Sequence, residues 1–223
     1  MDFSDNQINN EHHQDLIITL LTKKIVEPSP KKKRTSPKPT RRILCNAIEY
    51  LHFVGEAGVS NDINFVAEVF SKHVIPVISK YKRVYLFSDG GPKHFKISST
   101  LNMVLEAAND LINTKIEYHF FVSYHGHGIC DSAAAHAKAA INRHINRTLT
   151  TPINAKEICD IINTVKFHRG IPIHEPSTPV TEVKTFRGIR SYHKFVFDFG
   201  AIYAFAKSSD DSDFHVFVPS TKE

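Results

Sequence analysis

Two short apolar runs, each leading into a glycine-containing loop and an aspartate, constrain this chain more than any other feature. Residues 83–88 form a compact apolar run that ends at Asp89, and two glycines follow at once. Residues 115–122 alternate apolar and polar side chains and lead through a loop rich in Gly and His to Asp131. Residues 98–113, between the runs, have helical spacing. This order of strand, helix and strand predicts an α/β domain.

Further elements are predicted on both sides of this unit. Apolar residues recur at helical intervals over 61–80, and the alanine-rich segment 131–147 is the clearest helix of the chain. The other predicted elements are a strand-like segment over 43–54, a helix over 154–165, and strands over 181–186, 193–205 and 214–218. We therefore predict an α/β core with a mixed sheet flanked by helices over 43–168, and a β-rich C-terminal extension over 169–223.

The first 42 residues differ in composition from the rest. Residues 16–21 could form a helical turn or two, and residues 27–42 hold four prolines and a run of like charges. Proline breaks regular elements and like charges repel, so we predict a disordered basic tail over 1–42. The cluster Lys31, Lys32, Lys33 and Arg34 resembles a monopartite nuclear-import signal, which would bind an import receptor. A solvated linker or a nonspecific DNA-contacting arm is the alternative.

Composition narrows the class of protein. An apolar fraction of 41% with 16 Phe supplies a sizeable core, which argues against a wholly disordered chain. No apolar run approaches the roughly 18 to 20 residues that cross a bilayer, and the polar start is unlike a signal peptide. The three cysteines are far apart and odd in number, which argues against a disulfide framework. We expect an intracellular, nuclear protein, and the net charge of +5 is compatible with an acidic partner.

Asp89 is the first candidate site residue. Ligand sites of open α/β sheets gather at the carboxyl ends of strands, and glycines allow close approach to the backbone. Lys93 and Lys96 would place positive charge beside the carboxylate, which suits a nucleic-acid phosphate. The alternative is an Asp-Gly turn with solvated lysines.

Asp131 is the second candidate. It opens the alanine-rich helix, where a carboxylate also serves as an N-cap. Two carboxylates brought together at the edge of a sheet can hold Mg²⁺ or Mn²⁺ through hard oxygen ligands. A pair of such ions activates a water or hydroxyl for phosphodiester chemistry.

The histidines of the same loop raise a zinc alternative. Together with Cys130 and His136, the residues His125 and His127 have the nitrogen and sulfur ligands that zinc prefers. Their spacing fits no zinc finger or ribbon, and no second pair of cysteines is present. We expect His125 and His127 to order the loop or to contact substrate instead.

The motifs together resemble a eukaryotic transposon-encoded family of DDE/D transposases with an RNase H-like core. The resemblance rests on Ser-Asp-Gly-Gly-x-x-x-Phe-Lys at 88–96, on Ser-x-His-Gly-x-Gly-x-Cys-Asp at 123–131, and on Gly-x-Arg-x-x-His-x-Phe at 188–195. It covers roughly residues 50 to 205. It implies a partial RNase H-like fold, DNA as partner, Mg or Mn as cofactor, and work as a homo-oligomer. It also implies that Asp89 and Asp131 are catalytic metal ligands, surrounded by Lys93, Lys96, His125, His127 and Lys138.

The chain departs from that family before residue 89. The family's first acid lies on an upstream strand, and the acids available here are Glu49, Glu56 and Asp62. None has a convincing strand context, and Asp62 is placed to cap a helix. An incomplete triad would hold metal weakly, so the sequence leaves catalysis open. The alternative function is a noncatalytic nuclear module that binds nucleic acid or protein.

Overall fold

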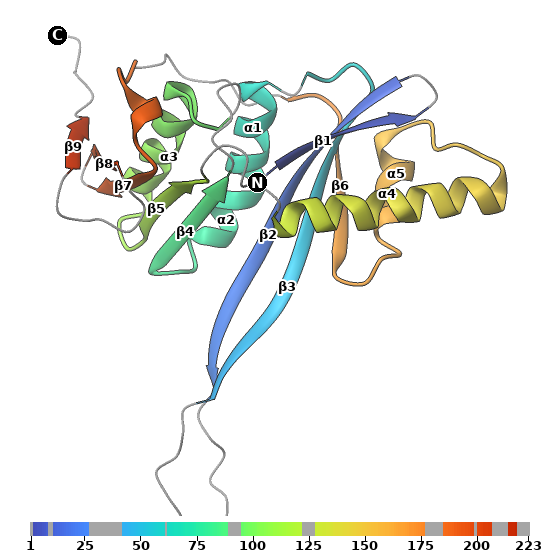
Figure 1. The fold of residues 1–223 in the computed structure, drawn as a ribbon, viewed down its shortest axis with the longest axis horizontal. Coiled ribbons are helices and arrows are strands. Elements are labelled where there is room, and N and C mark those ends of the chain that lie inside the picture. Colours follow the sequence, from blue (N-terminus) through green and yellow to red (C-terminus); the bar gives the residue numbers. More distant parts are fainter. Residues whose placement is uncertain are drawn as a thin grey trace, which may run out of the picture.

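The computed structural model describes residues 2–8, 11–26, 42–60, 62–88, 95–121, 128–176, 185–198, 200–206 and 214–217 (Figure 1). In chain order, the elements are β1 (Asp2–Ile8), β2 (Glu11–Val26), β3 (Arg42–Gly55), α1 (Ile63–Val69), the π-helix η1 (Phe70–Val74), α2 (Ile75–Ile78), β4 (Arg83–Ser88), α3 (Ser98–Asp110), β5 (Lys115–Phe120), α4 (Ile129–Thr148), α5 (Ala155–Ile162), β6 (His168–Ile173), the 3₁₀-helix η2 (Ile189–Ser191), β7 (Lys194–Asp198), β8 (Ala201–Phe205) and β9 (Phe214–Phe217). The fold is mixed α/β, as the sequence predicts.

The described strands form two sheets. One has the order β4-β5-β7-β8-β9, and only β4 and β5 are parallel in it. The other has the order β1-β2-β3-β6, in which β3 and β6 are parallel. This differs from the single mixed sheet that we predict over 43–168. The reason is that strands of the C-terminal part complete both sheets, since β6 pairs with β3 and β7 pairs with β5.

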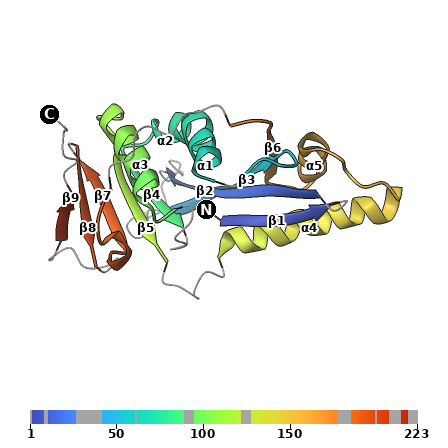
Figure 2. The same ribbon diagram turned by 90° about the horizontal axis from the view of Figure 1, so that it is seen from above.

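Alternation along β3 places helices on both faces of the four-stranded sheet. Leu51 and Phe53 belong to the large core cluster that α1 and α3 share with the five-stranded sheet. Val54 belongs instead to a second cluster with α4 and α5, and His52 is fully buried. Because side chains alternate along a strand, the two sets lie on opposite faces. Figure 2 shows α1 and α4 on opposite sides of β2 and β3.

The segment predicted as one helix over 61–80 is helical with an internal change of pitch. Asp62 caps α1, because its carboxylate accepts hydrogen bonds from the amides of Asn64 at 2.8 Å and Phe65 at 3.3 Å. The π-helix η1 then precedes Pro76, which is at the start of α2. A proline has no amide hydrogen for an intrahelical bond, so the change of pitch ahead of it has a clear cause.

The N-terminal tail is where the structure departs most from our prediction. Within the range 1–42, residues 2–8 and 11–26 form the antiparallel pair β1 and β2 rather than a disordered chain. Leu16 and Ile18, which we expected in a helical turn, are buried opposite Phe53 and Leu51 of β3. Their spacing of two matches a strand, and burial in the core decides between the two forms. Residues 27–41 lie outside the described residues.

Two other element predictions need correction. The strand predicted over 193–205 is a hairpin of β7 and β8, which turns at Gly200 with φ of 77°. Glycine adopts this left-handed conformation without steric cost. The strand β6 was not predicted at all, and most of the strand predicted over 181–186 lies outside the described residues.

Candidate functional site

The carboxyl edge of the parallel pair β4–β5 is where the sequence places its first candidate. The strands are in register from Arg83 opposite Lys115 to Ser88 opposite Phe120. Beyond the register, the amide of Phe121 donates to the carbonyl oxygen of Ser88 at 3.0 Å. Ser88 is fully buried, and its hydroxyl is 3.0 Å from the hydroxyl of Tyr118. The strand that leads to Asp89 is therefore fixed firmly up to its last residue.

Asp131 lies in the first turn of α4, although not as the N-cap that we considered. The N-cap is Gly128, and its amide donates to Oδ2 of Asp131 at 2.6 Å. A carboxylate at this position also favours the positive end of the helix dipole. Within the described part of the chain, the Gly128 amide bonds to Oδ2 of Asp131 and not to Oδ1. Figures 1 and 2 both show the beginning of α4 close to the end of β4.

Several predicted site residues cannot be placed. Asp89, Lys93, His125 and His127 lie outside the described residues, and so does the basic cluster Lys31–Arg34. Lys138 is described, and it is exposed on α4 two turns after Asp131. The Asp89–Asp131 pair, the surrounding cations and the import signal therefore stay predictions.

Lys96 corrects one of these expectations. We predict it as a contact to nucleic acid, but only 6% of the residue is exposed. Its Nζ donates to the carbonyl oxygen of Arg190 at 2.9 Å and lies 5.6 Å from the centre of the Phe120 ring. Burial lowers the pKa of the Lys96 ammonium. Lys96 therefore fastens η2 to the core rather than facing a ligand, since its long apolar stem is buried with the head.

Two of the three upstream acids that we considered have structural partners. Glu56, just after β3, accepts a hydrogen bond from the amide of Ala155 at 2.9 Å through Oε2. Its Oε1 is 3.0 Å from Nδ1 of His174. Glu56 thus stabilises the start of α5, as Asp62 stabilises the start of α1. Glu49 is half-buried within β3, which corrects our expectation that none of these acids has a strand context.

Of the acids described above, only Asp131 suits a hard cation. The Asp131 carboxylate is an oxygen ligand held at a defined position, which fits Mg²⁺ or Mn²⁺. Glu56 and Asp62 are occupied elsewhere and add nothing to it. Within the described ranges, no group of three or more His, Cys, Asp or Glu is placed to hold a metal ion. The zinc alternative depends on His125 and His127, so it stays untested.

The sequence analysis missed a buried pair of histidines, His52 and His168, next to the exposed His136 of α4. Nε2 of His52 and Nδ1 of His168 are 2.9 Å apart, and the ring of His136 lies 5.8 Å from that of His168. Burial lowers the pKa of His168 to about 4, and His52 and His136 add to the effect. His52 lies within an apolar strand, and nothing in the sequence around it indicates that its partner is His168, 116 residues away.

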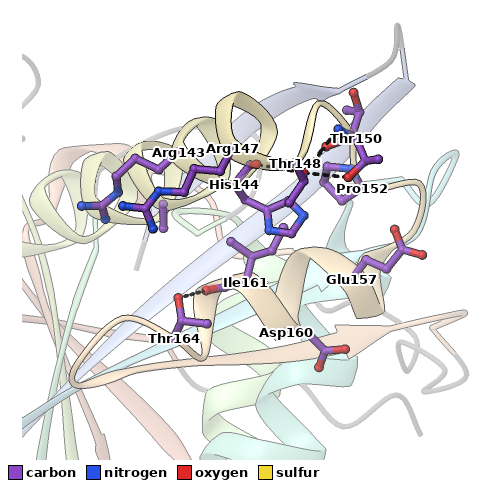
Figure 3. A pocket seen from close by; sticks show the side chains of 12 residues that line it. Arg143, His144, Arg147, Thr148, Thr150, Pro152, Glu157, Asp160, Ile161 and Thr164 are labelled. Carbon is purple, nitrogen blue, oxygen red and sulfur yellow. Dashed lines mark hydrogen bonds between the residues drawn. The ribbon is translucent and has the colours of Figure 1, made fainter.

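A hollow of about 730 Å³ lies between α4 and α5. Figure 3 shows Arg143 and Arg147 side by side on α4, with Glu157 and Asp160 on α5. Its lining residues are Ala140, Arg143, His144, Arg147, Thr148, Thr150, Thr151, Pro152, Glu157, Asp160, Ile161 and Thr164. Because the charges of the two walls are opposite, the hollow does not select an anion.

Comparison with known proteins gives one match. The model of the family described as a domain of unknown function, DUF8701, matches residues 59–201. No curated protein and no solved structure matches the chain. Separately, none of the helices in the described ranges is long and apolar enough to span a membrane.

Proposed function

Since the chain belongs to this family of unknown function, its role has to be argued from its own residues, and we propose a nucleic-acid-binding domain derived from an RNase H-like DDE/D transposase. The observation that carries the proposal is the β4–α3–β5 unit. It brings the carboxyl ends of two parallel strands to one edge. In the sequence, Asp89 follows β4 directly and Asp131 lies in the first turn of the helix after β5, so we propose that both carboxylates lie at this edge. Ligands of α/β sheets bind at such edges.

The resemblance to transposases is better supported for the β4–α3–β5 unit than for the other elements of the chain. A parallel strand pair joined by a helix is what an RNase H-like core requires between its second and third acids. The division into two sheets departs from the single sheet of that fold. We therefore restrict the homology proposal to the part of the chain around β4, α3 and β5.

Asp89 and Asp131 are the residues that would hold Mg²⁺ or Mn²⁺. When bound, such ions activate a water or hydroxyl and stabilise the leaving oxygen of a phosphodiester. Lys93, Lys138, His125 and His127 would contact the nucleic acid beside them. We leave Lys96 out of this set because it is buried. Strand cleavage and transfer would then be the ancestral reaction, and a homo-oligomer its working form.

A second candidate, a noncatalytic nuclear binding module, is favoured by a different observation. Glu56 and Asp62, two of the upstream acids, are engaged at helix starts. Asp131 also has a capping role that would preserve it without catalysis. In this case the domain keeps its fold and its affinity for DNA or protein, and loses strand cleavage. In either case Lys31–Arg34 would direct the chain to the nucleus.

A nicking assay on supercoiled plasmid with Mn²⁺ separates the two candidates. The transposase-derived enzyme requires nicking by the wild-type chain and loss of nicking in Asp89→Ala and in Asp131→Asn. Asn keeps one acceptor oxygen for the Gly128 amide, so Asp131→Asn tests the charge rather than the fold. Duplex binding without nicking supports the noncatalytic module. Unchanged nicking in both variants contradicts the assigned site, and absence of both binding and nicking contradicts the proposal.

A further inference from the structure

The outer face of the pair β4–β5 exposes aromatic side chains. Along β4 and β5, Leu86, Ser88, Tyr118 and Phe120 are buried toward the core. The alternate positions point away from it, and among them Tyr85 is 49%, Phe87 is 48% and Phe121 is 44% exposed. We call Tyr85, Phe87, His119 and Phe121 the aromatic patch. Contiguous exposed apolar surface of this kind marks an interaction site more often than chance.

The rings of the aromatic patch are aligned with one another. The ring of Phe87 is 4.9 Å from that of His119 and 6.0 Å from that of Phe121, and both pairs are inclined by only 20°. Tyr85 lies 6.2 Å from His119. These rings come from neighbouring strands, so the sheet fixes their spacing. Nearly parallel rings on a rigid sheet are suited to stacking against further flat rings.

Cations border the aromatic patch at the amino ends of the two strands. Arg83 and Lys115 are exposed opposite each other in the register. Arg83 donates from Nη1 to the hydroxyl of Tyr85 at 3.3 Å, which ties the charge to the patch. Among the described residues of β4 and β5, the acid is Glu117, whose side chain is only 12% exposed and lies 3.9 Å from Lys115 and 3.7 Å from His119. The accessible charge at this border is therefore positive.

Aromatic faces beside a positive border match the chemistry of single-stranded nucleic acid, and we infer that the aromatic patch binds a single strand of DNA or RNA. Unpaired bases stack on the rings, and the phosphates lie toward Arg83 and Lys115. A duplex does not fit the patch, because its bases are already stacked and paired. The inference deepens the proposed function and rests on it for the class of ligand. It assigns this ligand to a surface other than the carboxyl edge.

Fluorescence anisotropy with the full chain in EDTA tests the inference. The probes are labelled dT12, rU12 and a duplex of 12 base pairs. Phe87→Leu keeps apolar volume without a π-face, whereas Phe87→Tyr keeps the ring. Phe167→Leu is the matched control, since Phe167 is 59% exposed, directly precedes β6 of the other sheet, and has Nζ of Lys166 4.7 Å from its ring centre. All three side-chain changes are on the surface, and circular dichroism verifies the fold.

We expect the wild type to bind dT12 or rU12 more tightly than the duplex. Loss of one stacked base weakens binding by roughly 5- to 150-fold, so Phe87→Leu should fall in that range. Phe87→Tyr and Phe167→Leu should bind as the wild type does. With only two phosphates neutralised, log affinity should fall with log salt at a slope of about −1.4. A much steeper slope would assign the binding to the tail at Lys31–Arg34 and overturn the inference.

Three other outcomes overturn it as well. Equal affinity of Phe87→Leu and the wild type would show that the strand binds elsewhere. Failure of every single strand to bind, while the duplex binds, would leave the proposed function intact and make the aromatic patch a protein-docking face. Failure of all the probes would contradict both proposals. The plasmid assay needs Mn²⁺ and Asp89, whereas this assay needs neither, so the two failures are distinguishable.

Discussion

The buried histidine pair predicts that this fold loses stability as the solution becomes acidic. His168 is 7% exposed, and its neutral ring shares a hydrogen bond with His52 at 2.9 Å. Burial lowers the pKa of His168 from the usual 6.5 to about 4. Above pH 6.5 the ring is neutral in both states and its contribution is complete. Below pH 6.5, the His168 ring takes up a proton more readily in the unfolded chain than in the folded one. The free energy of unfolding therefore decreases as the pH is lowered.

The magnitude follows from the two pKa values. A fall from 6.5 to about 4 is worth about 3 kcal/mol once the pH is below both values. Between pH 7.5 and pH 5.0, the loss attributable to His168 is about 2 kcal/mol. Since a domain is typically stable by about 5 to 15 kcal/mol, this loss is large enough to measure.

Urea unfolding at pH 7.5, 6.5, 5.5 and 5.0 measures the effect. The chain has seven Tyr and no Trp, so far-ultraviolet circular dichroism is the suitable signal. His168→Gln keeps a hydrogen-bonding group beside His52 without a titrating ring. Between pH 7.5 and pH 5.0, the free energy of unfolding should fall by about 2 kcal/mol less in His168→Gln than in the wild type. His215→Gln, at an exposed position of β9, controls for the exchange itself. Identical pH dependence in His168→Gln and the wild type would refute the reasoning.

Three further substitutions test individual contacts by urea unfolding at pH 7.5. Gly170→Ala should destabilise by about 3 kcal/mol, because a Cβ there would meet Cα of Cys159 at 2.6 Å; a loss under about 1 kcal/mol would contradict this close approach. Glu56→Ala should cost about 1 to 2 kcal/mol by leaving the amide of Ala155 without its acceptor, and stability equal to the wild type would show that this bond contributes nothing. Lys96→Met should cost about 1 to 3 kcal/mol and leave DNA affinity unchanged, because Nζ bonds to the carbonyl oxygen of Arg190; weaker DNA binding in a fully folded variant would restore Lys96 as a ligand contact.

Local pattern was sufficient where an element has a strong period or a strong cap. The alanine-rich helix predicted over 131–147 is α4, extended by a residue or two at each end, and the helix predicted over 154–165 is α5, which Asn154 caps. The apolar run over 83–88 is β4 without a shift. In these segments, local preference and tertiary packing favour the same structure.

Prediction from the local sequence pattern failed where a contact with residues far along the chain decides the structure. The strand β6 contains Gly170 and Pro172, two residues that weaken any strand signal. Gly170 is needed because α5 lies against the strand there, and Pro172 is tolerated because β6 is at the edge of its sheet. Leu16 and Ile18 are a similar case, since only pairing with β3 fixes them as a strand. A contact far along the chain leaves no local trace, as the His52–His168 pair also shows.

The two sheets differ in how their faces are covered, and the five-stranded sheet has the more accessible face. The four-stranded sheet has helices on both faces of β3, whereas Tyr85, Phe87 and Phe121 leave the outer face of β4–β5 accessible. Phe87 also precedes Asp89 by two residues, a span of at most about 7 Å of extended chain. A strand that runs along the aromatic patch from Arg83 to Phe87 would therefore end within about one nucleotide of the candidate acid. On this argument the aromatic patch and the carboxyl edge are successive parts of one nucleic-acid path, and Phe87→Leu should weaken nicking of a single-stranded gap more than nicking of intact duplex.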